Sequence, residues 1–141
     1  MDLRHALETY TVLTIGDGLA ILLTEYLRQA IRRTLIKPHV NPQGELSAYL
    51  TEAGTEQAIE AAIEHGEHNS TLGLNPQAMR ELVTRVSRKL EAPGTPVVLI
   101  TSSASRYFLR QILEPTLPQA TVLSHNEVPP ETRVKSLGFA A

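Results

Sequence analysis

Residues 97–124, VVLITSSASRYFLRQILEPTLPQATVLS, decide the fold of this chain. They open with Val97–Ile100, a short and wholly apolar run that is typical of a strand covered on both faces. Ser102 or Ser103 can cap a helix after it, and Thr121–Ser124 is a second buried strand. The inward face of that helix carries Phe108, Leu109, Ile112 and Leu113. A strand, helix and strand with a crossover of this length predict a right-handed βαβ unit.

Further strands are predicted on both sides of this unit. Arg133–Phe139 reads as a third, less regular strand of the same buried kind. Upstream, Leu46–Thr51 is expected to be a strand, because alternate residues point to one face of a strand and three of them here are apolar. Those residues are Leu46, Ala48 and Leu50.

The region between these strands predicts two helices and one short strand. Thr55 can cap a helix that stops at Gly66 and has Ile59, Ala62 and Ile63 on its inner face. Thr71–Leu74 reads as a short strand. Asn75 followed by Pro76 is a strong helix start, with a cap residue before a proline at the first helical position. The inward residues of this second helix are Met79, Leu82, Val83, Val86 and Leu90. The prolines and glycine of 93–96 break the chain after it.

The first part of the chain, from Asp2 to about Lys37, predicts helix with a loop at Thr14–Gly18. We expect the apolar stripe of the second helix to supply core contacts. That stripe is Leu19, Leu22, Leu23, Tyr26, Ala30, Ile31 and Leu35. Pro38 and Pro42 end the helix and mark the main boundary. The sequence therefore predicts an α/β fold, a small and mostly parallel sheet with flanking helices, preceded by a helical segment.

The composition of the chain excludes several classes of function. The chain has 141 residues, of which 42% are hydrophobic and 20% charged, so one domain with a real core is expected. The formal net charge of −2 argues against non-specific nucleic-acid binding. The absence of cysteine excludes disulfides, thiolate metal sites and cysteine nucleophiles. No apolar run approaches the roughly 20 residues that span a bilayer, so we expect the chain as given to be soluble.

Two clusters of reactive residues have a plain structural interpretation. His65 and His68 flank Gly66 and Glu67, but the glycine should end the helix that would bring the histidines onto one face, and zinc needs further ligands. The run from Ser124 to Glu127 places Ser, His and Glu side by side, whereas catalysis needs them to converge in space. We interpret the first as a polar loop and the second as a turn, and we predict no catalytic, metal or cofactor residue.

Two surface features remain candidates for binding. The turn at 101–106 joins a buried strand to a helix, where Ser102, Ser103 and Arg106 could line an anion crevice. This gives an alternative function, a small α/β ligand-binding domain, although helix capping also explains the serines. The second feature is the basic set Arg28, Arg32 and Arg33, which clusters on one helix. We predict that these three arginines contribute to a contact with another subunit or partner, the alternative being a solvated helix face.

Six segments, taken in order, resemble the motifs of the FlhA-type (FHIPEP) export-gate family of bacterial flagella and injectisomes. They are residues 23–33 (LTEYLRQAIRR), 67–76 (EHNSTLGLNP), 96–102 (PVVLITS), 106–114 (RYFLRQILE), 117–128 (LPQATVLSHNEV) and 136–138 (SLG). The opening residues 2–8 are similar to that family as well. The resemblance covers nearly the whole chain with few gaps.

The resemblance implies a non-catalytic part of a type III protein export gate, at the cytoplasmic face of the bacterial inner membrane. Residues 1–39 would be the end of the third cytoplasmic subdomain, and residues 40–141 the fourth. The family forms a homo-oligomeric ring and meets export substrates, chaperones and other export-apparatus proteins, with no cofactor. Contact with the membrane would come only through an N-terminal half that this sequence does not include.

The departures from the family pattern affect two expectations. The membrane half and the first two subdomains are missing, so we expect Met1 to begin a fragment or a shortened gene product and the fragment to be a monomer. His125 stands where the family usually has tyrosine. Glu67 and His68 favour the flagellar branch, whereas Ala48-Tyr49-Leu50 favours the injectisome branch. We predict the flagellar branch over the injectisome.

Overall fold

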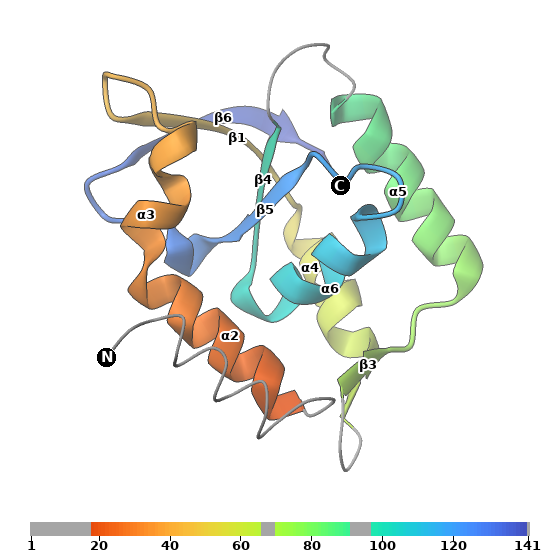
Figure 1. Cartoon of the computed structure of the whole chain (residues 1–141). Coiled ribbons are helices and arrows are strands. Elements are labelled where there is room, and N and C mark those ends of the chain that lie inside the picture. The colour runs from red at the N-terminus through yellow and green to blue at the C-terminus, as the bar shows by residue number, and fades with distance from the viewer. Residues whose placement is uncertain (1–17, 66–69, 91–96, 141) are drawn as a thin grey trace.

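The computed structural model describes residues 18–65, 70–90 and 97–140, and it is organised around a four-stranded parallel sheet (Figure 1). The strands are β1 (Glu45–Leu50), β4 (Val98–Thr101), β5 (Thr121–Ser124) and β6 (Arg133–Phe139). Their order across the sheet is β5-β4-β1-β6, with every neighbouring pair parallel. The predicted α/β class with a mostly parallel sheet is confirmed.

Helices cover one face of this sheet and form the larger core. They are α4 (Ala53–Ala62), α5 (Pro76–Leu90) and α6 (Ser103–Leu113). Each contributes fully buried apolar side chains, such as Ile59, Val86 and Leu109, which pack with Leu99 and Val122 of the sheet. The opposite face packs against Ile36. Burial on both sides explains why β4 is apolar at every position but its last.

The predicted βαβ unit is confirmed as β4, α6 and β5. The cap of α6 is Ser102, whose Oγ accepts a hydrogen bond from the backbone N–H of Ser105 at 3.2 Å. Register pairs such as Leu99 with Val122 and Ile100 with Leu123 place alternate residues on alternate faces. The start of α5 at Pro76 is also confirmed, because Asn75 Oδ1 accepts from the N–H of Ala78 at 2.7 Å.

The segment before α5 differs from its prediction in two respects. Helix α4 begins at Ala53 with Glu52 at the cap position, so Thr55 lies inside the helix and does not cap it. Ile63 does not extend the helix but opens β2 (Ile63–His65), which pairs antiparallel with β3 (Ser70–Leu72). The predicted stop at Gly66 and the break at 93–96 lie outside the described residues.

The predicted helix that ends near Lys37 is divided into two helices in the structure, and its buried face differs from the predicted one. Helix α2 (Gly18–Ala30) starts at Gly18, which was expected in a loop, and Ile31 separates it from α3 (Arg32–Ile36). The predicted stripe does not face the core throughout, because Leu22 is 68% exposed and Tyr26 71%. The expectations for 2–17 lie outside the described residues. A 3-10 turn, η1 (Lys37–His39), then leads to β1.

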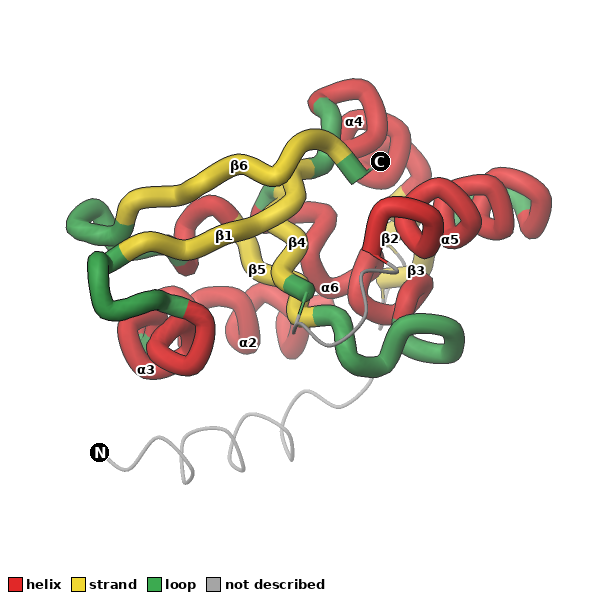
Figure 2. Tube along the Cα trace, turned by 90° about the horizontal axis from the view of Figure 1, so that it is seen from above, coloured by secondary structure: helices red, strands yellow, loops and turns green. Residues whose placement is uncertain are grey.

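Strand β6 lies at the sheet edge beside β1 (Figure 2). It was expected to be buried, yet Val134, Leu137 and Phe139 are 41–54% exposed. A register shift relative to β1 coincides with Gly138, whose φ of +108° is a conformation that glycine adopts without strain. No helix in the described part of the chain is both long and apolar enough to cross a bilayer.

Candidate functional site

Glu25 of α2 and Arg106 of α6 form a buried ion pair that fastens α2 to the α/β domain. The guanidinium donates from Nε to both carboxylate oxygens at 2.7 and 2.9 Å, and Nη2 lies 2.7 Å from Oε1. Both residues are at least 93% buried, with 7% and 6% exposed. Because an isolated buried charge is costly, each of these residues depends on the other. The face of α2 that meets the domain therefore carries buried charge beside apolar residues such as Ile21.

Arg28, one turn later on α2, makes a second pair at the end of β5. Its Nε lies 2.6 Å from Oε2 of Glu127, whose side chain is completely buried. The other carboxylate oxygen of Glu127 accepts from the backbone N–H of Ser124 at 2.8 Å. Ser124 and Glu127 form a capping box around the 3-10 turn η2 (His125–Glu127). Glu127 thus stabilises the turn η2 and also binds Arg28 of α2.

Arg33 of α3 makes a third pair, which lies on the surface. Its Nε donates to Oε1 of Glu131 at 2.6 Å and its Nη2 to Oε2 at 3.3 Å. The hydrogen bond from Arg33 lowers the pKa of Glu131 below its ordinary value, and the charge of Arg32 acts in the same direction. We call these three pairs, Glu25–Arg106, Arg28–Glu127 and Arg33–Glu131, the arginine clamp.

The clamp accounts for two of the three arginines that the sequence singled out for a partner contact. Arg28 and Arg33 are paired within the chain, and Arg32 is partly buried on the same helix as Arg33. The sequence reasoning recognised Arg28, Arg33 and Arg106, but it missed their acidic partners Glu127, Glu131 and Glu25. Glu25 lies outside the predicted apolar stripe and its partner Arg106 is 81 residues away, so no local pattern marks Glu25 as buried.

The turn at 101–106 is occupied by the protein's own groups. The hydroxyl of Ser102 donates to Oε1 of Glu60 at 2.6 Å, so a carboxylate already lies at the start of α6. Arg106, the cation of the predicted anion crevice, is buried against Glu25. Ser103 is the first residue of α6. This geometry removes the two features that favoured a ligand-binding crevice.

The two clusters that the sequence analysis interpreted as a loop and a turn, around His65 and Ser124, form no catalytic or metal site among the described residues. His65 ends β2, while positions 66–69 lie outside the description, and no group of three metal-ligating side chains occurs among the described residues. Ser124, His125 and Glu127 do not converge: His125 is exposed, 3.9 Å from Oε2 of Glu56, whereas Glu127 points inward. The predicted turn at this place is confirmed as η2.

The fold and these contacts define an α/β domain whose charged side chains hold a helical arm against the end of a parallel sheet. A profile of the FHIPEP family matches residues 20–133. The chain therefore belongs to the FHIPEP family.

Curated relatives and solved structures agree with this assignment. The chain is 29% identical over 120 residues to the flagellar biosynthesis protein FlhA of Bacillus subtilis and 31% identical over 111 residues to the invasion protein InvA of Salmonella typhimurium. These alignments cover 83% and 77% of the chain but only 18% and 16% of the relatives. The structure of the Chlamydia pneumoniae CdsV protein superposes with a TM-score of 0.78 at 30% identity, over 86% of this chain and 36% of that one. The chain thus spans about a fifth of the length of its curated relatives.

Proposed function

We propose that this chain is a non-catalytic cytoplasmic part of a bacterial type III protein export gate. The observation that carries the proposal is the FHIPEP match over residues 20–133, joined to relatives whose names are a flagellar biosynthesis protein and an invasion protein. Residues 1–39 would close the third cytoplasmic subdomain and residues 40–141 would form the fourth. Its place would be the cytoplasmic face of the inner membrane, where the chain docks export substrates, chaperones or other export-apparatus proteins.

A docking role rather than catalysis is supported by how the reactive groups are used. Ser102 caps a helix, Arg106 is neutralised by Glu25, and Glu127 orders a turn. Each has a structural partner in the described part of the chain. This leaves surfaces, not a pocket of reactive side chains, as what the domain offers to other molecules.

The ring is a further part of the proposal. A structure of the EscV cytosolic domain, similar in fold with a TM-score of 0.74, is described as nonameric. We propose that the longer protein forms a homo-oligomeric ring while this chain alone is a monomer. Of the three arginines predicted to contact a neighbour or partner, Arg32 fits best, because Arg28 and Arg33 are held by Glu127 and Glu131.

The flagellar branch remains our proposal over the injectisome branch, supported by the residues Glu67-His68 in the sequence. A pair of chimeras tests both branches at once. The 141-residue sequence would replace the matching segment of FlhA in Bacillus subtilis and of InvA in Salmonella typhimurium, each chimera expressed in a strain that lacks the parent gene. Motility in the first would support the flagellar assignment, and invasion in the second alone would reverse it. Function in neither, with both chimeras present at wild-type levels, would contradict the export role.

A further inference from the structure

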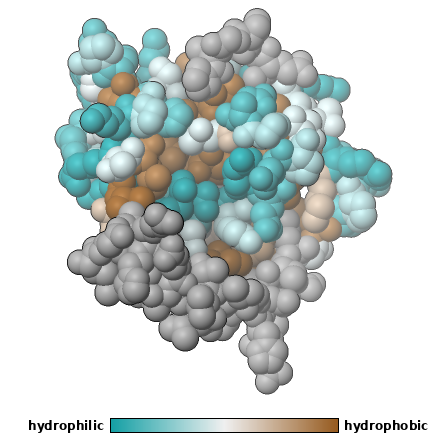
Figure 3. All heavy atoms as spheres, viewed as in Figure 1, coloured by the Kyte–Doolittle hydropathy of each residue, from teal (hydrophilic) through white to brown (hydrophobic). Residues whose placement is uncertain are grey.

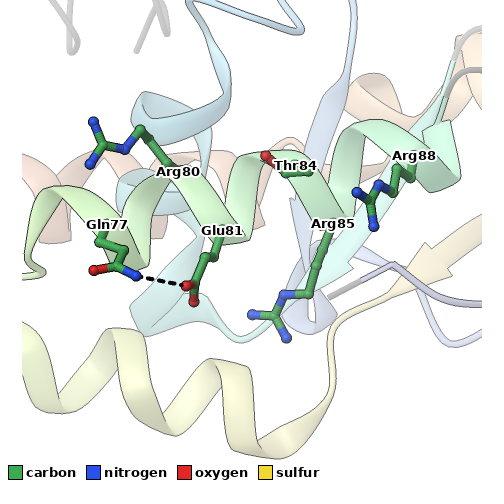
Figure 4. Close-up of a pocket in the computed structure, with 6 residues that line it drawn as sticks. All are labelled: Gln77, Arg80, Glu81, Thr84, Arg85 and Arg88. Atoms are coloured by element: carbon green, nitrogen blue, oxygen red, sulfur yellow. Dashed lines mark hydrogen bonds between the residues drawn. The ribbon is translucent and has the colours of Figure 1, made fainter.

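Helix α5 presents a row of cations on the side that faces away from the core. Its buried face consists of apolar residues such as Leu82 and Val86. The other side forms a shallow groove lined by Gln77, Arg80, Glu81, Thr84, Arg85 and Arg88 (Figure 4). Hydrophilic residues also line the right-hand margin of the molecule in Figure 3, where Figure 1 places α5. The groove is therefore polar and predominantly basic.

A second hollow continues the first. It is lined by Glu52, Arg85, Arg88, Lys89, Phe139 and Ala140, and it shares Arg85 and Arg88 with the first groove. We call the two together the α5 groove. Phe139 of β6 is 54% exposed and gives this end of the groove an apolar surface. From Arg80 to Arg88 the row extends about 12 Å along the helix, at 1.5 Å per residue.

The cations of the α5 groove differ from those of the arginine clamp. Arg28, Arg33 and Arg106 each meet a glutamate within 2.6–2.7 Å. No salt bridge within the described residues involves Arg80, Arg85, Arg88 or Lys89. Glu81, the groove carboxylate on the same helix, accepts a long hydrogen bond from Gln77 at 3.4 Å. In a chain with a net charge of −2, this leaves a local excess of positive charge.

We propose that the α5 groove docks an acidic segment of a protein partner, one that carries an aromatic or aliphatic side chain beside its carboxylates. Arginine suits this role, because its planar fork binds carboxylates in two-point contacts. Phe139 offers the apolar contact at the end of the row. The groove recognises such a segment by alternating charge and one apolar site.

The same pattern of charges disfavours a uniform polyanion. Glu81 and Glu52 lie in the groove among the cations and would repel a continuous phosphate backbone or an anionic lipid surface. A peptide can place its carboxylates at the arginines and its backbone N–H groups near the glutamates. This inference does not depend on the export role, because it rests only on the contents of the groove.

The test is fluorescence anisotropy with the 141-residue chain and a labelled peptide that alternates Glu and Leu around one Phe. We expect saturable binding that weakens with salt, and a Kd about tenfold higher for R85E/R88E, since two exposed attractions become repulsions. The matched control is K37E/K135E, which changes the net charge equally at two exposed lysines away from the groove and should keep the wild-type Kd. Circular dichroism of both variants verifies that each is folded.

Three results would overturn the proposal. One is equal binding of the counterpart peptide in which every Glu is Gln. Another is a Kd that is unchanged in R85E/R88E, or a wild-type chain that shows no saturable binding of the acidic peptide. The third is tighter binding of single-stranded DNA, or of vesicles that contain phosphatidylglycerol, than of the acidic peptide. Because no export assay is used, failure here is separate from failure of the chimeras.

Discussion

The Nε atom of Arg28 lies 2.6 Å from Oε2 of Glu127, a carboxylate with no solvent exposure. Arg28→Ala would leave that carboxylate buried without its cation. We expect a loss of about 2–4 kcal/mol in unfolding free energy, toward the lower part of the range for breaking buried pairs because the Arg28 side chain is 25% exposed. Urea unfolding followed by circular dichroism measures it. A change below about 0.5 kcal/mol, as for ordinary surface substitutions, would contradict the inward role of Glu127.

The Glu25–Arg106 pair predicts a non-additive double substitution. Glu25→Leu or Arg106→Met alone leaves one buried charge without its partner and should lower the unfolding free energy by about 3–5 kcal/mol. The double variant leaves no unpaired buried charge, so it should be more stable than either single variant. A double-mutant cycle from urea unfolding gives the coupling free energy between the two side chains. Additive losses would mean that the two side chains act independently, against the bidentate geometry.

The exposed Arg33–Glu131 pair predicts a change in titration rather than in stability. Because Arg33 holds the pKa of Glu131 low, Arg33→Ala should raise that pKa toward its ordinary value of 4.5. The folded-state value is the depressed one, so any contribution of this pair is present above pH 4.5 and is lost as the pH falls through the folded pKa. Carbon-detected NMR titration of the Glu131 carboxyl group measures the shift. An unchanged titration curve in the variant would show that Arg33 is not the cause.

The exposed apolar pair on α2 predicts tolerance to polar substitution. Leu22→Ser and Tyr26→Ser should each change the unfolding free energy by less than about 0.5 kcal/mol, because those side chains are already 68% and 71% exposed. Leu109→Ala, at a fully buried position, is the comparison and should cost about 2–5 kcal/mol. Thermal or urea unfolding distinguishes the two classes. Large losses at Leu22 and Tyr26 would restore the sequence-based orientation of α2.

Because the turn at 101–106 is occupied by the protein's own side chains, we expect it not to bind small anions. Phosphate, nucleotides and dicarboxylates should leave the Tm of the chain unchanged, since Arg106 is committed to Glu25 and Ser102 to Glu60. A genuine ligand at 100 times its Kd would add about 2.7 kcal/mol, which a thermal-shift assay detects readily. A stabilisation that disappears in Ser102→Ala would revive the ligand-binding alternative.

Strands β4 and β5 could be predicted from the sequence because both are covered on both faces. A buried parallel strand is apolar at successive positions, so Val97–Ile100 is recognisable without any partner strand. The caps at Asn75 and Ser102 were equally local, since a side-chain oxygen bonds a backbone N–H within three residues.

The orientation of α2 could not be predicted, because periodicity assumes that the apolar face is the buried one. Here Glu25 and Arg28 are turned inward, and each is compensated by a residue far along the chain, Arg106 and Glu127. Only the tertiary structure brings such partners together. The edge position of β6 is a similar case, because the residues of a strand do not tell how many neighbouring strands it has.

The strand order also has a consequence for how the domain folds. β1 lies between β4 and β6, so the first strand made waits for partners that emerge from the ribosome much later, the last of them at Arg133–Phe139. Such long-range pairing gives a high contact order, which slows folding. During synthesis the apolar residues of β1, Leu46 and Ala48, have no sheet to join. We therefore expect the nascent chain to depend on molecular chaperones until β6 has been synthesised.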